Sequence, residues 1–131
     1  SRVGARSEDA VRRALSGLEA EGWRLRHSLA WGGRGDIDSL AIAPTGAAFT
    51  IETKTRTFDE RHLAHARDTA VWLRRRRRRW CRRGAFPVLC VVRARGLEAV
   101  EDGVLVVSPD RLVSALRAGA GTSPRPGFLA T

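Results

Sequence analysis

The chain of 131 residues is 43% hydrophobic and 29% charged, which suits one soluble globular domain and excludes two. No apolar run approaches the roughly 20 residues of a membrane span, and no secretory signal opens the chain, so we expect a cytoplasmic protein with no membrane partner. The net charge of +10 favours a polyanionic partner, above all nucleic acid.

The first half of the chain predicts one helix and three strands. Ser7 is a typical N-cap, and the apolar spacing up to Gly22 predicts a helix over residues 7–21. Alternating apolar and polar residues predict a strand over 23–29, before a glycine-rich loop. Two further strands, 36–43 and 47–54, are joined by Pro44-Thr45-Gly46, which is typical of a tight hairpin.

The second half predicts two helices and two strands. A long helix is expected from about Asp59 to Arg83, because its apolar residues form one stripe. Strands over 87–92 and 103–107 follow, and Ser108-Pro109-Asp110 opens a last helix. This order favours an α/β fold, in which an antiparallel three-stranded meander continues into a mixed five-stranded sheet flanked by helices.

The ends of the chain and its two cysteines carry smaller expectations. We expect residues 1–118 to form the domain and the Gly- and Pro-rich residues 119–131 to form a tail. The chain begins at Ser1, which is typical of an excised domain or a processed chain, so a homodimer and a larger parent protein both stay open. Cys81 and Cys90 form no C-x-x-C pair, so we expect buried, inert thiols in a reducing compartment rather than zinc ligands or a disulfide.

The hairpin centred on Thr45 brings acidic side chains together. Under symmetric pairing Asp38 opposes Glu52 and Asp36 opposes Lys54, and all four side chains emerge on one face. A bulge at the hairpin would shift this register by one residue. Carboxylates at directly opposed positions, about 5 Å apart, must share either a proton or a cation.

A hard divalent ion fits this pair of acids better than zinc does. Mg²⁺ and Mn²⁺ prefer carboxylate oxygens and water, so Asp38, Glu52 and the backbone carbonyl of Thr53 are the predicted ligands. Of the 24 basic residues 23 are Arg, so the single Lys54 indicates a position where a guanidinium will not serve. Lys54 would orient or deprotonate the attacking water, or neutralise charge on the phosphorane. An exposed Glu-Lys pair without chemistry is the alternative.

Consecutive arginines form the most basic segment. The predicted contacts with nucleic-acid phosphates are Arg74, Arg75, Arg76, Arg78, Arg79 and Arg82. Arginines at successive helical positions surround the helix, so only some of them can face one partner. A solvated basic face or a helix that docks a partner protein is the alternative. Trp72 and Trp80 flank the run, where we expect core packing or stacking on bases.

Two segments carry a family resemblance. Gly35-Asp36-Ile37-Asp38-Ser39 and Ile51-Glu52-Thr53-Lys54-Thr55 resemble the nuclease-related domain, NERD, of the PD-(D/E)xK superfamily, and the similarity covers about residues 4–117. The resemblance implies a restriction-endonuclease-like α-β-β-β-α-β core with metal ligands at Asp38 and Glu52 and a catalytic Lys54. It also implies an auxiliary acid at Glu8. The family commonly has His where this chain has Ser39.

Two further auxiliary residues and a function complete the sequence-based expectations. Asp36 shares the predicted face with the metal ligands, and His65 lies near the start of the long helix, where the superfamily often presents polar groups to the phosphate. We predict a Mg²⁺- or Mn²⁺-dependent endonuclease that hydrolyses phosphodiester bonds in nucleic acid, with DNA as the first expectation and RNA left open. The alternative is a nuclease-fold module that binds nucleic acid or docks a partner protein without turnover.

Overall fold

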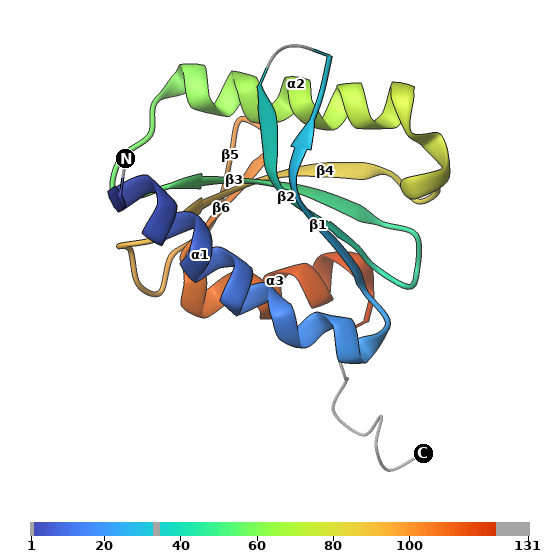
Figure 1. Ribbon diagram of the computed structural model, residues 1–131, viewed down its shortest axis with the longest axis horizontal. Coiled ribbons are helices and arrows are strands. Elements are labelled where there is room, and N and C mark those ends of the chain that lie inside the picture. The colour runs from blue at the N-terminus through green and yellow to red at the C-terminus, as the bar shows by residue number, and fades with distance from the viewer. Residues whose placement is uncertain (1, 33–34, 123–131) are drawn as a thin grey trace.

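The computed structural model describes residues 2–32 and 35–122, which form a six-stranded mixed sheet with helices on both faces (Figure 1). In chain order the elements are α1 (Arg2–Ser16), the 3₁₀ helix η1 (Gly17–Glu21), β1 (Arg24–Ala30), β2 (Asp36–Ile42), β3 (Ala48–Lys54), α2 (Glu60–Arg76), the 3₁₀ helix η2 (Arg78–Trp80), β4 (Ala85–Val91), β5 (Glu98–Glu101), β6 (Val104–Val107) and α3 (Pro109–Ala120). The predicted α/β class is confirmed, with one strand more than expected.

The sheet combines an antiparallel half and a parallel half. Its strand order is β1-β2-β3-β4-β6-β5, and β1, β2 and β3 form the predicted meander. β3 pairs with β4, and β4 with β6, in parallel. A parallel connection must cross the sheet, and α2 provides that crossover between β3 and β4. β4 is therefore central and covered on both faces, which explains its nearly continuous apolar sequence.

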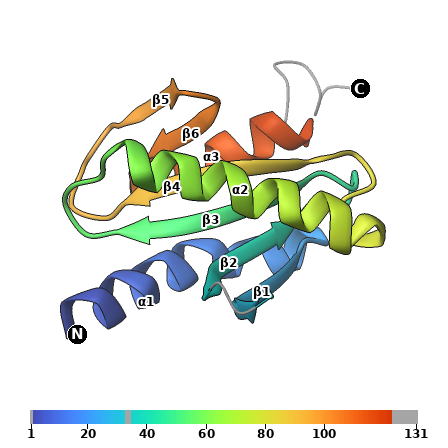
Figure 2. The same ribbon diagram turned by 90° about the horizontal axis from the view of Figure 1, so that it is seen from above.

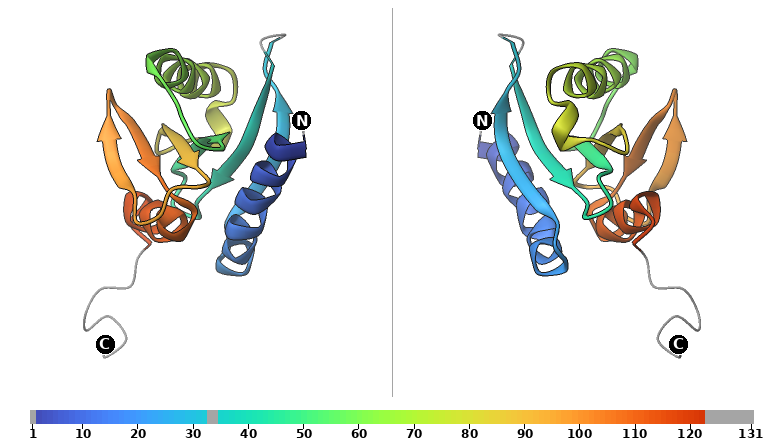
Figure 3. Two further views of the ribbon diagram at one scale, coloured as in Figure 1. Left: turned by 90° about the vertical axis from the view of Figure 1, so that its left-hand side faces the viewer. Right: turned by 90° about the vertical axis from the view of Figure 1, so that its right-hand side faces the viewer.

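The helices form a layer on each face of the sheet. α1 and α3 pack against each other and cover one face, and α2 covers the other (Figure 3). Phe49 and Ile51 of β3 lie in the core beneath α1 and α3, whereas Leu40 of β2 and Ala48 of β3 pack against α2. Alternate positions of one strand thus serve two separate cores, as the period of two along a strand requires.

The first helix begins earlier than the sequence predicts. α1 starts at Arg2, so Ser7 lies inside the helix rather than at its N-cap, and Glu8 is outside the first turn. The hydroxyl of Ser7 is within hydrogen-bond distance, 2.9 Å, of the hydroxyl of Thr55. A tertiary partner has therefore replaced the capping role that the sequence alone suggests. Gly22 ends the helical region in the left-handed conformation, with φ of 89°, as predicted.

The long helix ends earlier than the sequence predicts. α2 stops at Arg76, where the apolar stripe has run out after Leu73, and Arg77 leaves helical geometry with φ of −134°. Trp80 follows in η2 and packs against the same core cluster as Leu73. The chain turns back to bury Trp80, because continuing the helix through arginines would bury nothing. The arginine run is therefore divided between the last turn of α2, its cap and η2.

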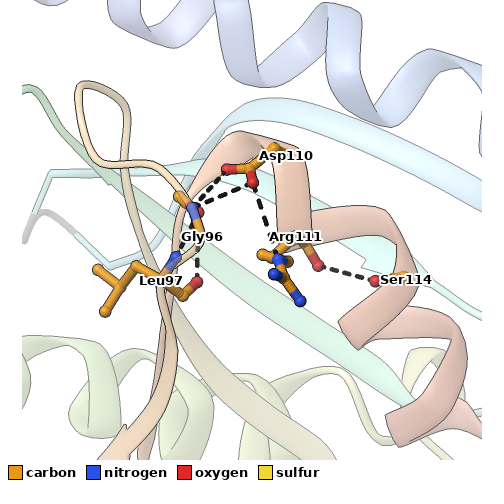
Figure 4. A network of polar contacts seen from close by, with 6 residues as sticks. Gly96, Leu97, Asp110, Arg111 and Ser114 are labelled. Carbon is orange, nitrogen blue, oxygen red and sulfur yellow. Dashed lines mark hydrogen bonds and ion pairs between the residues drawn. The ribbon is translucent and has the colours of Figure 1, made fainter.

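The strand that the sequence did not predict lies at the edge of the sheet. All four residues of β5 are exposed, so no apolar alternation marks it. The loop before β5 is tied to the start of α3, where the Asp110 carboxylate accepts from the Gly96 backbone N–H and Ser108 Oγ accepts from that of Leu97 (Figure 4). Pro109 occupies the first turn of α3, as predicted.

Smaller expectations have mixed outcomes. Both cysteines are free and buried, as predicted, and burial raises the pKa of the Cys90 thiol to about 12. Within the described residues, no helix has the length and apolar character needed to cross a membrane. α3 runs to Ala120, two residues into the predicted tail, and residues 123–131 of that tail lie outside the described residues.

Candidate active site

The hairpin register is the predicted one, and it ends where the candidate site begins. Ile42 pairs with Ala48, and Leu40 with Thr50, but the β2–β3 ladder stops at Ser39–Ile51. Beyond that pair the two strands separate (Figure 2). We call this separation, with Asp38 on one side and residues 52–54 on the other, the strand fork. An Asp38 carboxylate oxygen accepts from the Thr53 backbone N–H at 2.9 Å, so a side chain takes over where the ladder hydrogen bonds end.

Glu52 lies on the other side of the strand fork and is buried. Its side chain faces the α2 side of the sheet, and its Oε1 atom is buried without a hydrogen-bond partner. The pKa of Glu52 is raised to about 8. Burial is the main cause, followed by the negative charge of Asp38 and a hydrogen bond with the Asp38 side chain. An acid kept in such surroundings favours either a proton or a bound cation.

Lys54 supplies the positive charge at the strand fork. It is two residues beyond Glu52, so both side chains leave β3 on the same face. The charge of Lys54 lowers the pKa of Glu52, which partly offsets the effect of burial. The pKa of His62 is lowered mainly by burial and secondly by the charge of Lys54. Lys54 has no ion pair with any residue that the structure describes, so its ammonium group is available to a ligand.

A third carboxylate reaches the strand fork from α1. Burial raises the pKa of Glu8, and a side-chain hydrogen bond with Asp38 raises it further. The Ser7–Thr55 contact fixes this turn of α1 beside the chain that leaves β3. The fold thus brings Glu8 to the predicted position, although its auxiliary role stays a prediction.

Two histidines of α2 approach from the opposite face. Nε2 of His65 is 3.9 Å from Oε1 of Glu52, the oxygen that lacks a hydrogen bond. His62 belongs instead to the helix cap, where its Nδ1 accepts from the Asp59 backbone N–H. His65 is therefore the histidine that the geometry brings to the acids, and its catalytic role stays a prediction.

Asp36 is not brought to the acids, and the predicted pairing of Asp36 with Lys54 is wrong. Asp36 pairs with Ala30 of β1 and is exposed. The pairing fails because the β2–β3 ladder ends at Ser39, three residues along β2 from Asp36. Symmetric pairing would continue along the full length of both strands, whereas the strands of a twisted sheet diverge.

Ser39 and His27 form a polar pair on the far side of β2. The Ser39 hydroxyl lies 2.8 Å from Nδ1 of His27, and Ser39 is buried. Because side chains alternate along β2, Ser39 points away from the face that carries Asp38. Burial and the charge of Arg12 on α1 lower the pKa of His27, which indicates the α1 side of the sheet.

The residues at the strand fork fit a hard divalent cation. Glu52 Oε1 is a buried acceptor without a donor, and the adjacent Asp38 adds a second carboxylate. The N–H of Thr53 points to Asp38, and because N–H and C=O of one strand residue project to the same side, the Thr53 carbonyl also faces β2. Among the described residues no three His, Cys, Asp or Glu side chains form a metal-holding group. A cation here would keep several waters, as Mg²⁺ usually does.

The predicted nucleic-acid contacts lie away from the strand fork. Arg74 to Arg79 and Arg82 are all exposed, at the end of α2 and in the turn that follows. Trp80 is not free for stacking on a base, because the guanidinium groups of Arg26 and Arg77 lie over its ring at 5.3 Å and 5.5 Å.

Trp31 is a residue near the site that the sequence analysis did not single out. Its ring meets the ring of His65 edge-on, with centroids 5.3 Å apart, and it is almost fully buried. The signal was present in the sequence as an aromatic residue at the start of a glycine-rich loop, but nothing there indicated which helix it would meet.

Comparison with known proteins identifies the class of the fold. A repair endonuclease from Pyrococcus abyssi has a similar structure, with a TM-score of 0.50 and 12% sequence identity over 85% of this chain. The match spans 42% of that endonuclease chain, so this chain corresponds to less than half of its length. The shared fold is restriction-endonuclease-like. No curated protein matches the sequence.

The family follows from the sequence itself. The model of the nuclease-related domain, NERD, matches residues 3–94, which is more than half of the chain. The chain belongs to the nuclease-related domain family, as the segments around Asp38 and Glu52 predicted.

Proposed function

We propose that this protein is a metal-dependent endonuclease that hydrolyses phosphodiester bonds in nucleic acid, with DNA as the expected substrate and Mg²⁺ or Mn²⁺ as the cofactor. The observation that carries the proposal is the buried Oε1 of Glu52, an acceptor without a donor beside a second carboxylate. Leaving such an atom unmatched is costly, and a cation would satisfy it. Family membership supports a nuclease-related role and thereby a nucleic-acid partner.

Each residue at the strand fork has a distinct task in this proposal. Asp38 and Glu52 would hold the cation, with the Thr53 carbonyl as a third protein ligand. When bound, the cation would supply charge stabilisation at the scissile phosphate and make a bound water more acidic. The Thr53 N–H fixes the orientation of Asp38, so that acid is preorganised.

Lys54 would act on the water and the phosphate, whereas His65 would act through Glu52. The Lys54 ammonium, free of ion pairs among the described residues, would orient the attacking water or neutralise charge that develops on the phosphate oxygens. His65 is 3.9 Å from Glu52, too far for a hydrogen bond but near enough for a bridging water. It would support the position of Glu52.

The test is cleavage of plasmid DNA and of RNA by the purified protein with Mg²⁺, Mn²⁺ or EDTA. The proposal predicts cleavage that requires the metal and is lost in Asp38→Ala, Glu52→Ala and Lys54→Ala. Each variant should still bind the substrate, because the exposed arginines are untouched.

The opposite result would favour the module without turnover. Undiminished binding with no cleavage under any metal, in protein whose folding is verified by thermal unfolding, would contradict catalysis. Cleavage of RNA but not of DNA would retain the mechanism and overturn the expected substrate.

A further inference from the structure

A groove lies beside the strand fork, between α2 and the end of the β1–β2 hairpin. Its walls include Trp31, Gly32, Asp68, Trp72, Arg75 and Arg76, and its volume is about 410 Å³. That volume falls within the range of roughly 300–1,000 Å³ typical of sites for small organic groups. None of the residues assigned to the chemistry above lines the groove.

A chain of contacts connects the groove to the candidate active site. His65 lies 3.9 Å from Glu52, and its ring meets the ring of Trp31 edge-on at 5.3 Å. The ring of Trp31 in turn meets that of Trp72 at 5.7 Å. A ligand on Trp72 would therefore be connected to His65, at the strand fork, through the packed rings of Trp72 and Trp31.

The groove has aromatic walls. Trp31 and Trp72 both line it. Trp72 is half-buried, so part of its indole remains open to the groove. Trp31 is almost fully buried and packs against Trp72, so it supports the exposed ring from behind.

Charges divide the groove into two ends. Arg75 and Arg76 are exposed at one end and suit a phosphate. Asp68 has no ion pair within the described part of the chain, and its carboxylate repels phosphate but accepts hydrogen bonds from the amino groups of a base. A flat ring with N–H groups, attached to a phosphate, matches this arrangement.

We propose that the groove binds one unpaired nucleotide of the substrate strand, near the C-terminal end of α2 and farther along the strand than the phosphate held at the strand fork. The base stacks on Trp72 with its N–H groups toward Asp68, and its phosphate lies against Arg75 and Arg76. A base inside a duplex has no free face for Trp72, so the groove selects single-stranded or unpaired nucleic acid. This inference rests on the proposed function, whose substrate supplies the strand.

Binding measured in EDTA tests the groove separately from cleavage. The probes are fluorescein-labelled single strands of DNA and of RNA, and a labelled blunt DNA duplex of equal length. Fluorescence anisotropy measures the affinity of the protein for each probe. Trp72→Leu removes the stacking face but keeps an apolar side chain, and should weaken single-strand binding roughly tenfold while changing duplex binding less than about twofold. Trp72→Phe, which keeps an aromatic face, should retain most of the affinity.

Trp80→Leu is the matched control, since Trp80 does not line the groove and has the guanidinium groups of Arg26 and Arg77 over its ring. It should leave the ratio of single-strand to duplex affinity unchanged. The inference would be overturned if Trp72→Leu lost equal affinity for single strand and duplex, or if Trp80→Leu lost as much affinity for the single strand alone. It would also be overturned if no single strand bound at low salt. A selective loss in a protein that never cleaves would instead support the groove and contradict the proposed function alone. The DNA and RNA arms decide which strand it accepts.

Discussion

The two ends of α2 carry opposite kinds of chemistry. Near its start, His65 faces Glu52, a buried acid on β3 at the strand fork. The Oε1 atom of this acid has no hydrogen-bond partner. Near its end, Arg74, Arg75 and Arg76 are exposed. His65 and Arg74 are roughly 14 Å apart along the helix axis, at 1.5 Å per residue.

This difference suggests separate roles for the two ends of α2, chemistry at the strand fork and phosphate binding at the arginine end. The strand fork concentrates negative charge in a buried place, which costs stability unless a cation or proton is present. The arginine end places positive charge in water, where it costs little and, in the proposed function, would contribute affinity for phosphates without reading the base sequence. We therefore expect substitutions at the strand fork to change rate and stability, and substitutions at the arginine end to change binding and its salt dependence.

The largest expected effect is on the rate of cleavage. Asp38→Asn and Lys54→Ala should each lower kcat by about a hundredfold to ten thousandfold, because in the proposed function the acid would hold the cation and the amine would stabilise developing charge. Single-turnover cleavage of a labelled substrate measures it. Asp36→Asn, which makes the same change at a residue that the structure separates from the fork, should lower kcat less than about tenfold. Equal losses in Asp36→Asn and Asp38→Asn would erase the distinction between them.

A second effect concerns the stability of the metal-free protein. The pKa of Glu52 is raised from 4.5 to about 8, so the folded state binds a proton more tightly than the unfolded state does. The proton bound by Glu52 therefore stabilises the folded state fully below about pH 4.5, and this stabilisation is lost as the pH rises through 8. Each unit of difference between the two pKa values corresponds to roughly 1.4 kcal/mol. In EDTA, Glu52→Gln should stabilise the protein by a few kcal/mol at pH 9 and far less at pH 5.

Urea unfolding at both pH values measures this difference. Mn²⁺ should raise the stability of the wild type at pH 9 and leave Glu52→Gln almost unchanged. A wild type that is as stable at pH 9 as at pH 5 in EDTA would mean that Glu52 is solvated rather than buried.

A third effect tests the exposed arginines of η2, which follow the arginine end of α2. Arg78→Ala/Arg79→Ala should lower the slope of log affinity against log salt concentration for duplex DNA by about 2, with kcat unchanged. Arg13→Ala/Arg111→Ala removes the same charge from α1 and α3, on the other face of the sheet, and should change the slope by less than about 1. Equal changes in both double variants would show that net charge alone, rather than the arginines of η2, attracts nucleic acid.

The smallest effect is expected at the position where the family commonly has His. Ser39→Ala removes the hydrogen bond to His27 and should cost about 1 kcal/mol of stability. Cleavage should be unchanged, because Ser39 points away from the face that carries Asp38. A large loss of activity without a loss of stability would show that the His27–Ser39 pair reaches the chemistry.

The sequence predicted those parts of the molecule that depend on local periodicity. The meander, the crossover helix and the register of the β2–β3 hairpin follow from alternation and turn residues, and the structure agrees. Asp38 and Glu52, predicted as directly opposed residues, lie just beyond the last pair of that ladder, where the Thr53 N–H donates to Asp38 instead. β5 was missed because its four exposed residues have no apolar pattern.

Features that depend on tertiary contacts could not be predicted. Ser7 resembles an N-cap until Thr55, far along the chain, is seen to lie against it. Asp36 shares a predicted face with Lys54, but the strands separate before they meet. Trp31 gave no sign of its contact with His65, because the partner lies on an element that only the folded sheet brings near.

The most direct test of the account is a crystal of the protein soaked in Mn²⁺ and measured for anomalous scattering. The account predicts a peak between the carboxylates of Asp38 and Glu52, with the Thr53 carbonyl as a further ligand. No peak there at a Mn²⁺ concentration well above that used for cleavage, or Glu52 hydrogen-bonded to protein groups alone, would contradict it.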